Sequence, residues 1–384
     1  MRKFLVIIGD GMAGWPLKNH ENKTTLELAT TTNLDFLTQN GELGLVKNVP
    51  DGLPPGSDVA NLSIFGYNPE LYYQGRASIE AVSQNIHLDK DDVVFRVNIV
   101  FMEQGIMKDF TAHHIGNEEA HNIISLLNEK MRDRFPFIEF YPGVSYRNLM
   151  VIKNEDSQSL TKITTCPPHD ITDKPVVSYL PQSDLLLEIM QEANNILRAA
   201  HRNESIWLWG QGGKFAIPNF KVLFNLEGVV ITAVDLVKGI GLAAGLKYLT
   251  VPGITGFIDT NFTGKARYAL EALKNSDIAF IHVEAPDEAG HMGDLALKKK
   301  AIEEFDEKVV GTILRENTFE ELAILVLPDH ATPLEIKTHS ADAVPYVIYR
   351  NYRHVQGSKK YCEKEAVNNY VDEGYKLLGC FIKG

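Results

Sequence analysis

Four short clusters of acidic, histidine and serine residues are the most informative chemical feature of this chain. Long stretches of other sequence separate the clusters. Carboxylates and imidazoles are the ligands that a pair of divalent cations needs, and a serine among them becomes a nucleophile when its hydroxyl pKa is lowered. The pattern therefore predicts a two-metal phosphoryl-transfer enzyme. The clusters contain Asp10, Ser57, the pair Asp287 and His291, and the pair Asp329 and His330 with His339 close behind.

Asp287 and His291 are four residues apart, and Pro286 stands just before them. If a helix begins near Pro286, both side chains lie on one face and can chelate one ion. This spacing alone is weak evidence, but an apolar run before it strengthens the prediction. His339 is uninterpretable alone, and it gains a role only by completing this set.

The other clusters also have ordinary explanations. Asp10 could be a turn residue between two glycines, although glycines also let a backbone approach an ion or a phosphate. Ser57 could cap a helix, and this fits a functional role, since a helix N-terminus presents amide donors to a phosphoryl group. Asp329 and His330 could be surface loop residues. In a loop at the end of a strand, however, both side chains can turn towards one or two ions.

Apolar runs precede three of the clusters and predict the strands that position them. Each run is short and continuous, which is typical of a central parallel strand with a functional loop at its carboxyl end. A charged, amphipathic stretch at 295–314 predicts a crossover helix, and residues 25–40 have apolar positions at helical spacing. Strand, helix and strand with a ligand after each strand predict an α/β sandwich around a mostly parallel sheet. The runs are residues 4–8, 278–283 and 322–327.

The middle of the chain differs, because its predicted strands are shorter and lie in a more polar setting. No ligand cluster lies there, while clusters lie on both sides. We therefore expect a smaller inserted α/β (α+β) domain at 86–205, and a discontinuous catalytic domain formed by 1–85 and 206–384. The predicted strands are 93–101, 137–141 and 148–153, the predicted helices are 118–134 and 184–202, and two prolines in 166–170 predict a loop there without a helix.

Composition narrows the function classes. The chain has 384 residues, a net charge of −12 and three widely spaced cysteines. The negative charge argues against a binder of nucleic acid or of a membrane surface. The odd cysteine number suits a reducing cytoplasm, and the apolar run near the start is too short for a signal peptide or a membrane span. We expect a cytoplasmic protein of about two domains.

Longer motifs around the clusters carry a family resemblance that runs nearly end to end. They are residues 7–13, 54–61, 141–147, 167–172, 207–212, 233–236 and 284–291. Together they resemble the alkaline phosphatase superfamily and, within it, the archaeal-type phosphoglycerate mutases that need no bisphosphoglycerate cofactor. The resemblance implies an alkaline-phosphatase-like sandwich and interconversion of 3-phosphoglycerate and 2-phosphoglycerate, with phosphoglycerate as the substrate.

The resemblance also implies a role for each clustered residue. Ser57 would take the phosphoryl group from one glycerate hydroxyl and return it to the other through a phosphoserine intermediate. Lys265 is a candidate partner for the charge on that group. The family pattern implies one ion held by Asp287, His291 and His339, and a second held by Asp10, Ser57, Asp329 and His330. The resemblance favours manganese or magnesium, manganese first, and mixed Asp and His ligands also suit zinc.

Four residues of the inserted domain would bind the glycerate. Arg147 would clamp the carboxylate, Asp170 could deprotonate the attacking hydroxyl, and His114 and His169 would complete the site. The family usually has Ala-Gly-His where this chain has Ala-His-His at 112–114. This departure leaves open whether His113 or His114 faces the substrate.

Three other functions compete with the mutase. Residues 12–16 lean towards proposed homoserine kinases of the same superfamily, while 170–172 and 210–212 lean towards the mutase. A plain phosphomonoesterase is a third possibility, if the intermediate is not protected from water. A non-catalytic metal-binding protein of the same fold is the fourth. The sequence does not predict the oligomeric state.

Overall fold

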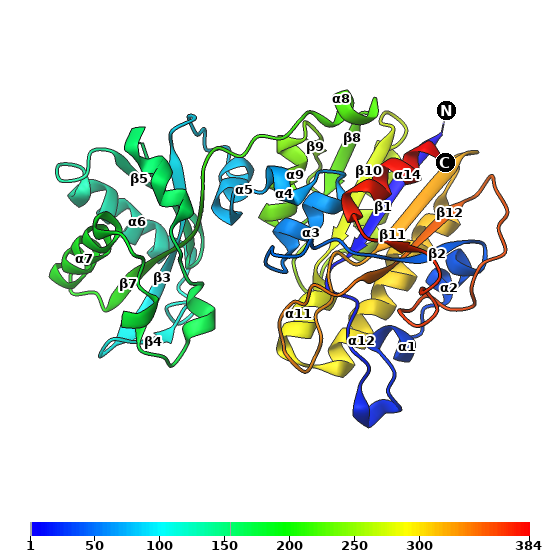
Figure 1. The fold of residues 1–384 in the computed structure, drawn as a ribbon, viewed down its shortest axis with the longest axis horizontal. Helices are drawn as coiled ribbons and strands as arrows, with labels where there is room; N and C mark the ends of the chain where they lie inside the picture. The colour runs from blue at the N-terminus through cyan, green and yellow to red at the C-terminus, as the bar shows by residue number, and fades with distance from the viewer. Residues whose placement is uncertain (1, 154) are drawn as a thin grey trace. The chain divides into compact units, whose positions relative to one another are not determined.

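The computed structural model describes residues 2–153 and 155–384, and the chain divides into two compact units (Figure 1). The first unit contains the residues up to Tyr73 together with Ile217–Gly384, and the second is Gln74–Ala216. The sequence predicts these boundaries near 85 and 206. The first boundary lies earlier because helix α5 (Arg76–Ser83) packs its Ala77 and Ala81 into an apolar cluster with strands of the second unit. The second lies later because β7 (Glu204–Gly212) pairs with β3 (Val93–Glu103) of the second unit.

The first unit is built on an eight-stranded sheet of order β13-β2-β12-β11-β1-β10-β8-β9. Strand β1 runs parallel to both of its neighbours, β10 and β11, while β12 runs antiparallel to β11 and β2. The mostly parallel sheet predicted from the apolar runs is confirmed. The strands are β1 (Lys3–Gly9), β2 (Gly41–Val46), β8 (Gly228–Ile231), β9 (Lys247–Tyr248), β10 (Ile278–Val283), β11 (Leu322–Leu327), β12 (Val344–Arg350) and β13 (Tyr370–Val371).

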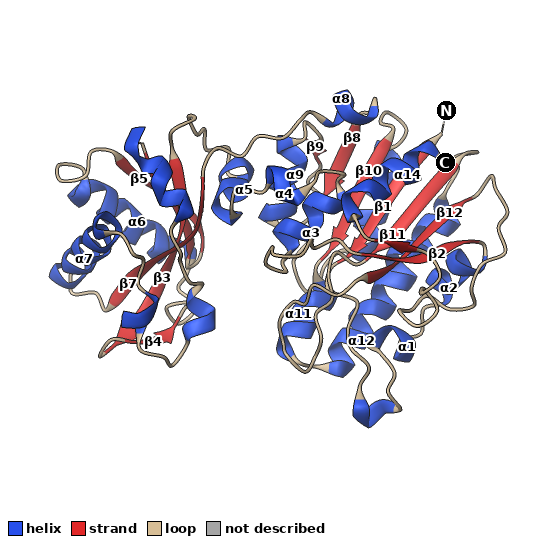
Figure 2. Ribbon diagram, viewed as in Figure 1, coloured by secondary structure: helices blue, strands red, loops and turns tan. Residues whose placement is uncertain are grey.

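The central strands are mostly apolar because helices cover both faces of the sheet (Figure 2). On one face Ile281 of β10 belongs to the same buried cluster as Ile302 of α12 (Leu295–Glu304). On the other face the Phe280 ring stacks on Phe65, which directly follows α3 (Ser57–Ile64), with ring centroids 4.2 Å apart. Alternate residues of one strand thus fix helices on opposite sides of the sheet.

Two helix predictions in this unit need correction or refinement. The helix expected at 25–40 is wrong as one element, because the backbone becomes extended at Ala29 and a threonine-rich segment follows. The helix expected at 295–314 continues as α12, a π-helical segment (Phe305–Val310) and α13. The remaining helices are α1 (Thr25–Leu28), α2 (Thr32–Gln39), α4 (Pro69–Tyr72), α8 (Phe220–Phe224), α9 (Asp235–Ala243), α10 (Phe262–Ala272), α11 (Ala285–Met292), α13 (Gly311–Glu316) and α14 (Leu377–Lys383).

The second unit has a five-stranded antiparallel sheet with helices packed against it (Figure 2). One prediction is wrong here: a short 3₁₀ helix, Pro168–Ile171, lies in the segment expected to be a plain loop. Proline suits the first turn of a helix because its missing N–H is not needed there. The elements are β3 (Val93–Glu103), β4 (Ile106–Asp109), β5 (Ile138–Val144), β6 (Arg147–Ile152), β7 (Glu204–Gly212), α6 (Asn117–Met131) and α7 (Asp184–Ala199).

Among the described residues, no helix is both long enough and apolar enough to cross a membrane. Helix α7, for example, has 16 residues and carries charged and polar side chains along one side. Its apolar positions instead face the core of the second unit, where Leu186, Ile189 and Leu197 are buried.

Candidate metal centre

Three neighbouring strands bring acidic residues to one edge of the first unit's sheet. Asp10 directly follows β1, and Asp329 lies two residues after the end of β11. Asp287 lies on α11, which begins two residues after β10. Because β1, β10 and β11 run parallel and in register, their carboxyl ends meet. This edge is where open α/β sheets place their ligands.

Helix α3 adds the serine to this edge. Ser57 is its first residue, and the N-cap position is taken by the extended Gly56, so Ser57 is not the capping residue. The Oγ instead lies 3.1 Å from His330 Nε2, and Ser57 is buried. The structure therefore places the serine hydroxyl against one of the predicted ligands, with the N-terminus of α3 behind it.

Asp10, His282 and Asp329 form the first group that could hold a cation, with ligand atoms all within 4.8 Å of one another. His282 Nε2 lies 3.1 Å from Asp10 Oδ2 without making a well-aligned hydrogen bond. Among the described residues, neither this nitrogen nor the buried Asp10 Oδ1 has a hydrogen-bond partner. Buried polar atoms are nearly always satisfied, so two orphans facing one point fit a bound cation.

Asp287, His330 and His339 form the second such group, and His291 joins it. Asp287 and His291 share one face of α11, as their spacing predicts, with Oδ2 and Nε2 3.1 Å apart. The Nε2 atoms of His291 and His339 lie only 3.0 Å apart. His339 Nε2 also lies 3.6 Å from Asp287 Oδ1. The imidazole nitrogens lie close to one carboxylate and to each other. Ligands around a metal ion have this arrangement.

His330 lies between the two groups. The sequence assigns it to the ion of Asp10 and Asp329, and its Nε2 is 3.5 Å from Asp10 Oδ1 and 3.4 Å from Asp329 Oδ2. Its ligand atoms also fall within the group of Asp287 and His339. Either assignment is within reach of this ring, and its assignment to one ion stays a prediction.

His282 is the member of the site that the sequence does not reveal. It lies inside β10, in an apolar run that predicts only a strand. Its side chain is fully buried, and its Nδ1 lies 3.3 Å from the hydroxyl of Thr232. The available signal is the histidine itself, because an imidazole in a buried strand needs polar partners on both nitrogens.

Burial and neighbouring charges shift the acids of the site in opposite directions. Burial raises the pKa of Asp10 well above its usual value, and the carboxylate of Asp329 raises it further. Burial would also raise the pKa of Asp287, but its bonds with His291 and His339 outweigh this and hold the pKa well below its usual value. The carboxylates crowd each other, and a cation between them would relieve that repulsion.

The buried histidines are held neutral. Burial lowers the pKa of His282 to about 3 and that of His330 to about 4. A neutral imidazole keeps the lone pair that a metal ion needs. Both rings are therefore in the protonation state of a ligand near neutral pH.

Gly11 allows the loop after β1 to fit between the two groups. Its φ of +61° is in the left-handed region, and a Cβ at this position would lie 2.5 Å from Asp287 Oδ1. Its N–H donates to Asp329 Oδ1 at 3.1 Å. Only a residue without a side chain can hold one carboxylate while lying this close to the other.

Asn61 and Asn48 fix the remaining atoms of Asp329. Asn61 Nδ2 donates to Asp329 Oδ2 at 3.0 Å and to the carbonyl of Ser57 at 2.8 Å. Asn48 Nδ2 donates to the carbonyl of Asp329 at 2.9 Å. The serine and the carboxylate are thus held by a shared amide, an arrangement that the sequence does not predict.

Lys265, predicted as a partner for the transferring charge, lies fully buried on α10. Its Nζ donates to the carbonyl of His282 at 2.7 Å, and burial lowers its pKa to about 8. In the structure this lysine fixes the end of β10 and the buried histidine there.

The four residues predicted to bind glycerate all lie in the second unit. Arg147 is the exposed first residue of β6, and His169 Nε2 lies 3.6 Å from Asp170 Oδ1 on the 3₁₀ helix. His113 and His114 both have positive φ values, 58° and 55°. The His113 ring contacts Phe101 and lies 3.3 Å from Asp109 Oδ2 through Nδ1, so His113 is engaged within the second unit.

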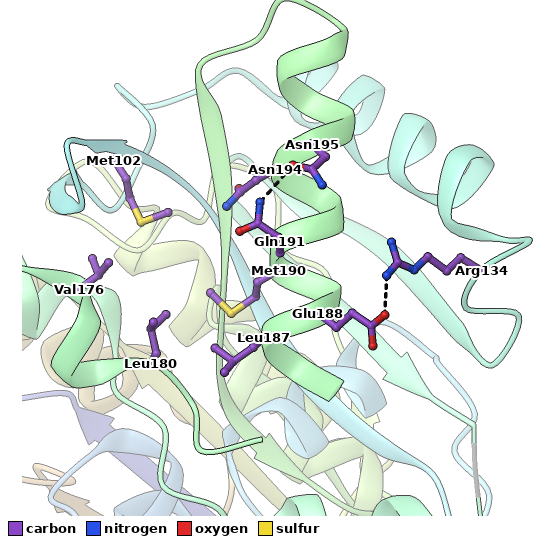
Figure 3. Close-up of a pocket in the computed structure, with 10 residues that line it drawn as sticks. All are labelled: Met102, Arg134, Val176, Leu180, Leu187, Glu188, Met190, Gln191, Asn194 and Asn195. Carbon is purple, nitrogen blue, oxygen red and sulfur yellow. Dashed lines mark hydrogen bonds and ion pairs between the residues drawn. The ribbon is translucent and has the colours of Figure 1, made fainter. Parts of the chain in front are cut away.

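A groove of about 570 Å³ also opens on the second unit, along α7 (Figure 3). Met102, Leu187 and Met190 form its apolar part, and the ion pair between Arg134 and Glu188 lies at its rim. None of the residues predicted from the motifs lines this groove, so it has no part in the predicted chemistry.

Comparison with known proteins agrees with this geometry. The family model described as 2,3-bisphosphoglycerate-independent phosphoglycerate mutase matches residues 38–203. A protein of that name from Methanosarcina acetivorans is 45% identical and covers 99% of this chain and 100% of its own length. Another from Pyrococcus horikoshii is 35% identical over 95% of this chain and 92% of its own length.

Solved structures show the same fold. The structure of a Pyrococcus horikoshii protein matches with a TM-score of 0.82 and 29% identity, covering 100% of this chain and 97% of that one. A cofactor-independent phosphoglycerate mutase from Thermoplasma acidophilum matches with a TM-score of 0.65 and 20% identity, over 100% and 99% of the two chains. The predicted α/β fold class is thereby confirmed.

Proposed function

The chain belongs to the family of 2,3-bisphosphoglycerate-independent phosphoglycerate mutases, and from this we propose that it interconverts 3-phosphoglycerate and 2-phosphoglycerate through Ser57. The resemblance predicted from the motifs is confirmed, and with it an isomerase. The full-length relatives support this function over the homoserine kinase and phosphomonoesterase alternatives. The observation that carries the role of Ser57 is its Oγ, 3.1 Å from His330 Nε2 at the N-terminus of α3.

Two divalent metal ions fit the residues of this edge. We propose that Asp287, His291 and His339 hold one of them, because their ligand atoms converge. Asp10, Asp329 and Ser57 would hold the other, with His330 between them and His282 as an added ligand. When bound, such ions lower the pKa of a hydroxyl and neutralise charge on a transferring phosphoryl group. Manganese is the ion we propose first, with magnesium and zinc as alternatives.

Ser57 would act as the nucleophile in the first half-reaction. Its hydroxyl would lose its proton to solvent and its Oγ would form a bond to phosphorus while the bond from phosphorus to the glycerate oxygen breaks, and the amide groups at the start of α3 would face the phosphoryl oxygens. In the second half-reaction the other glycerate hydroxyl would attack the phosphoserine, the bond from phosphorus to Ser57 Oγ would break, and Ser57 would take a proton back from solvent. We propose Asp170 as the group that donates a proton to the leaving oxygen and later accepts one from the attacking hydroxyl.

The second unit would recognise the glycerate. Arg147 has an exposed guanidinium, which suits a carboxylate that must bind and leave. His114 and His169 are the proposed partners of the hydroxyls, since the His113 ring already contacts Phe101. Lys265 keeps its proposed role as a positive charge, and its Nζ donates to the carbonyl of His282.

A coupled assay tests this function directly. The purified protein would be supplied with 3-phosphoglycerate, manganese and enolase, with no bisphosphoglycerate, while homoserine and ATP run in a parallel tube. Conversion that a chelator abolishes and fresh manganese restores is the expected result. If 3-phosphoglycerate is not converted in the first tube and phosphohomoserine forms in the second, the site would instead belong to a kinase.

The place of the protein in the cell stays a proposal. Its cysteines Cys166, Cys362 and Cys380 are unpaired in the structure. Free thiols suit a reducing compartment, so we propose the cytoplasm.

A further inference from the structure

A fully buried lysine lies close to the metal centre and has no part in the chemistry proposed above. Lys298 is on α12, and its side chain has no exposed surface. Its Nζ donates to the carbonyl of Thr332 at 2.7 Å and to the carbonyl of Ala13 at 3.0 Å. A single ammonium thus joins two loops that are far apart in the sequence.

These two loops are the ones that carry the ligands after β1 and β11. Ala13 lies two residues after Gly11, whose N–H holds the Asp329 carboxylate. Thr332 lies two residues after His330, and its own N–H donates to the carbonyl of Ala13 at 3.1 Å. The loops therefore meet at one carbonyl, which accepts from both a main-chain N–H and Lys298.

The side chain of Thr332 continues the connection to the ligands. Its hydroxyl donates a short hydrogen bond to Asp287 Oδ1. The same hydroxyl lies 3.3 Å from His330 Nδ1. Asp287 and His330 belong to one of the two groups that could hold a cation. One buried hydroxyl thus contacts a carboxylate and an imidazole of the same group.

The lysine at this position has a physical cost that an apolar residue would avoid. Burying an ammonium is unfavourable unless it is well paired, and here the acceptors are carbonyls rather than a carboxylate. A methionine would fill a similar volume without that cost. The presence of a buried lysine here indicates that its hydrogen bonds to the two carbonyls contribute to the structure of the site.

We propose that Lys298 and Thr332 form a positioning pair for the metal centre. Lys298 fixes the two ligand loops against each other, and Thr332 orients Asp287 and His330. Neither side chain binds metal or substrate in this proposal. The inference rests on the metal centre of the proposed function and adds the residues that set its geometry.

Charge and positioning predict opposite effects when Lys298 is removed. A positive charge near a cation site repels the cation, so Lys298→Met would tighten metal binding if charge alone mattered. If Lys298 positions the ligand loops, the same substitution weakens metal binding. The sign of the change therefore separates the two explanations.

Manganese affinity of the full chain, measured from the EPR signal of free Mn²⁺, is the readout. We expect Lys298→Met and Thr332→Val each to weaken binding about 10- to 100-fold, as the loss of residues that support metal ligands does. Thr332→Ser keeps the hydroxyl and should bind almost as the wild type does. Lys300→Met removes an equal charge from an exposed position of the same helix and should also bind normally. The loss of manganese affinity in the double variant Lys298→Met/Thr332→Val should be smaller than the sum of the two single losses, since both residues act on the same ligand loops.

Normal or tighter binding by a folded Lys298→Met, or by Thr332→Val, would overturn the positioning pair. If Lys298→Met does not fold, the comparison of Thr332→Val with Thr332→Ser decides, because equal affinities there would also overturn it. A wild-type chain that binds no manganese, magnesium or zinc would overturn the metal centre itself. If only the positioning pair is wrong, the wild-type chain still binds metal and is still active in the mutase assay. Failure of the positioning pair can therefore be told apart from failure of the proposed function.

Discussion

The edge of the first unit's sheet and the predicted glycerate residues of the second unit handle polar groups in opposite ways. At the sheet edge Asp10, Asp329 and His330 are each only 1% exposed. In the second unit the side chains of His169 and Asp170 are 48% and 61% exposed. A metal site needs ligands that are assembled and desolvated beforehand, whereas residues for a substrate must exchange it with water. The contrast separates the two proposed tasks between the units.

The largest expected effect comes from removing the proposed nucleophile at the sheet edge. Ser57→Ala should lower turnover by about 10⁴-fold or more, since a missing nucleophile cannot be replaced by its neighbours. Thermal unfolding should stay near that of the wild type, and metal content should fall little, since Asp10, His282 and Asp329 remain to hold the ion that Ser57 also binds. Substantial turnover in the enolase-coupled assay would show that the phosphoryl group does not pass through Ser57.

Metal removal should distinguish the units by their stability. Ions bound at 100 to 1,000 times their dissociation constant stabilise the folded state by about 3–4 kcal/mol. A chelator should therefore lower the unfolding temperature of the first unit and leave that of the second unchanged. Calorimetry with and without chelator measures this, and fluorescence of Trp207 and Trp209 in a Trp15→Phe variant reports on the second unit alone, because Trp15 lies in the first unit. Equal shifts of both transitions would contradict the assignment of the ions to the sheet edge.

His282→Leu tests the ligand that the sequence did not reveal. Loss of this imidazole should weaken the binding of one of the two ions about 100-fold and leave the other ion bound. Metal analysis should then find close to one ion per chain. Thr232→Val is a matched control, because it removes only the hydroxyl that lies 3.3 Å from His282 Nδ1. Two ions at unchanged affinity in His282→Leu would remove this residue from the metal site.

The smallest change in activity is expected from substituting the exposed residues of the second unit. Arg147→Ala should raise KM for 3-phosphoglycerate about 10- to 100-fold, with a smaller change in kcat and no change in metal content. Arg147→Lys keeps the charge but loses the paired donors, so an intermediate KM is expected. An unchanged KM in Arg147→Ala would leave the carboxylate clamp without support.

The sequence predicts much of this fold because its strongest signals are local. The runs 4–8, 278–283 and 322–327 match β1, β10 and β11 closely, since a buried parallel strand needs a continuous apolar segment. The helix at 25–40 fails for the opposite reason. The extended backbone at Ala29 is decided by local sterics and packing that a helical spacing of apolar residues does not reveal.

The residues of the candidate site also divide into those that the sequence could place and those that it could not. Asp287 and His291 could be placed on one helix face from their spacing alone, because helix geometry fixes it. The resemblance assigns His330 to the ion of Asp10 and Asp329, but its proximity to Asp287 and His339 could not be predicted, since loop side chains have no fixed period. His282 could not be found at all, because only the pairing of β10 with β1 brings it to Asp10.

The place of β1 in the sheet has a consequence for how the chain acquires its structure during synthesis. This strand is made before its partners, since Phe4 pairs with Ile278 of β10 and with Ala323 of β11. The second unit, Gln74–Ala216, has all its strand partners within one continuous stretch, so it can fold before β10 and β11 are made. The apolar β1 stays unpaired until β10 and β11 have been made. Closing such distant contacts is slow, so newly made chains are most prone to aggregate during this interval.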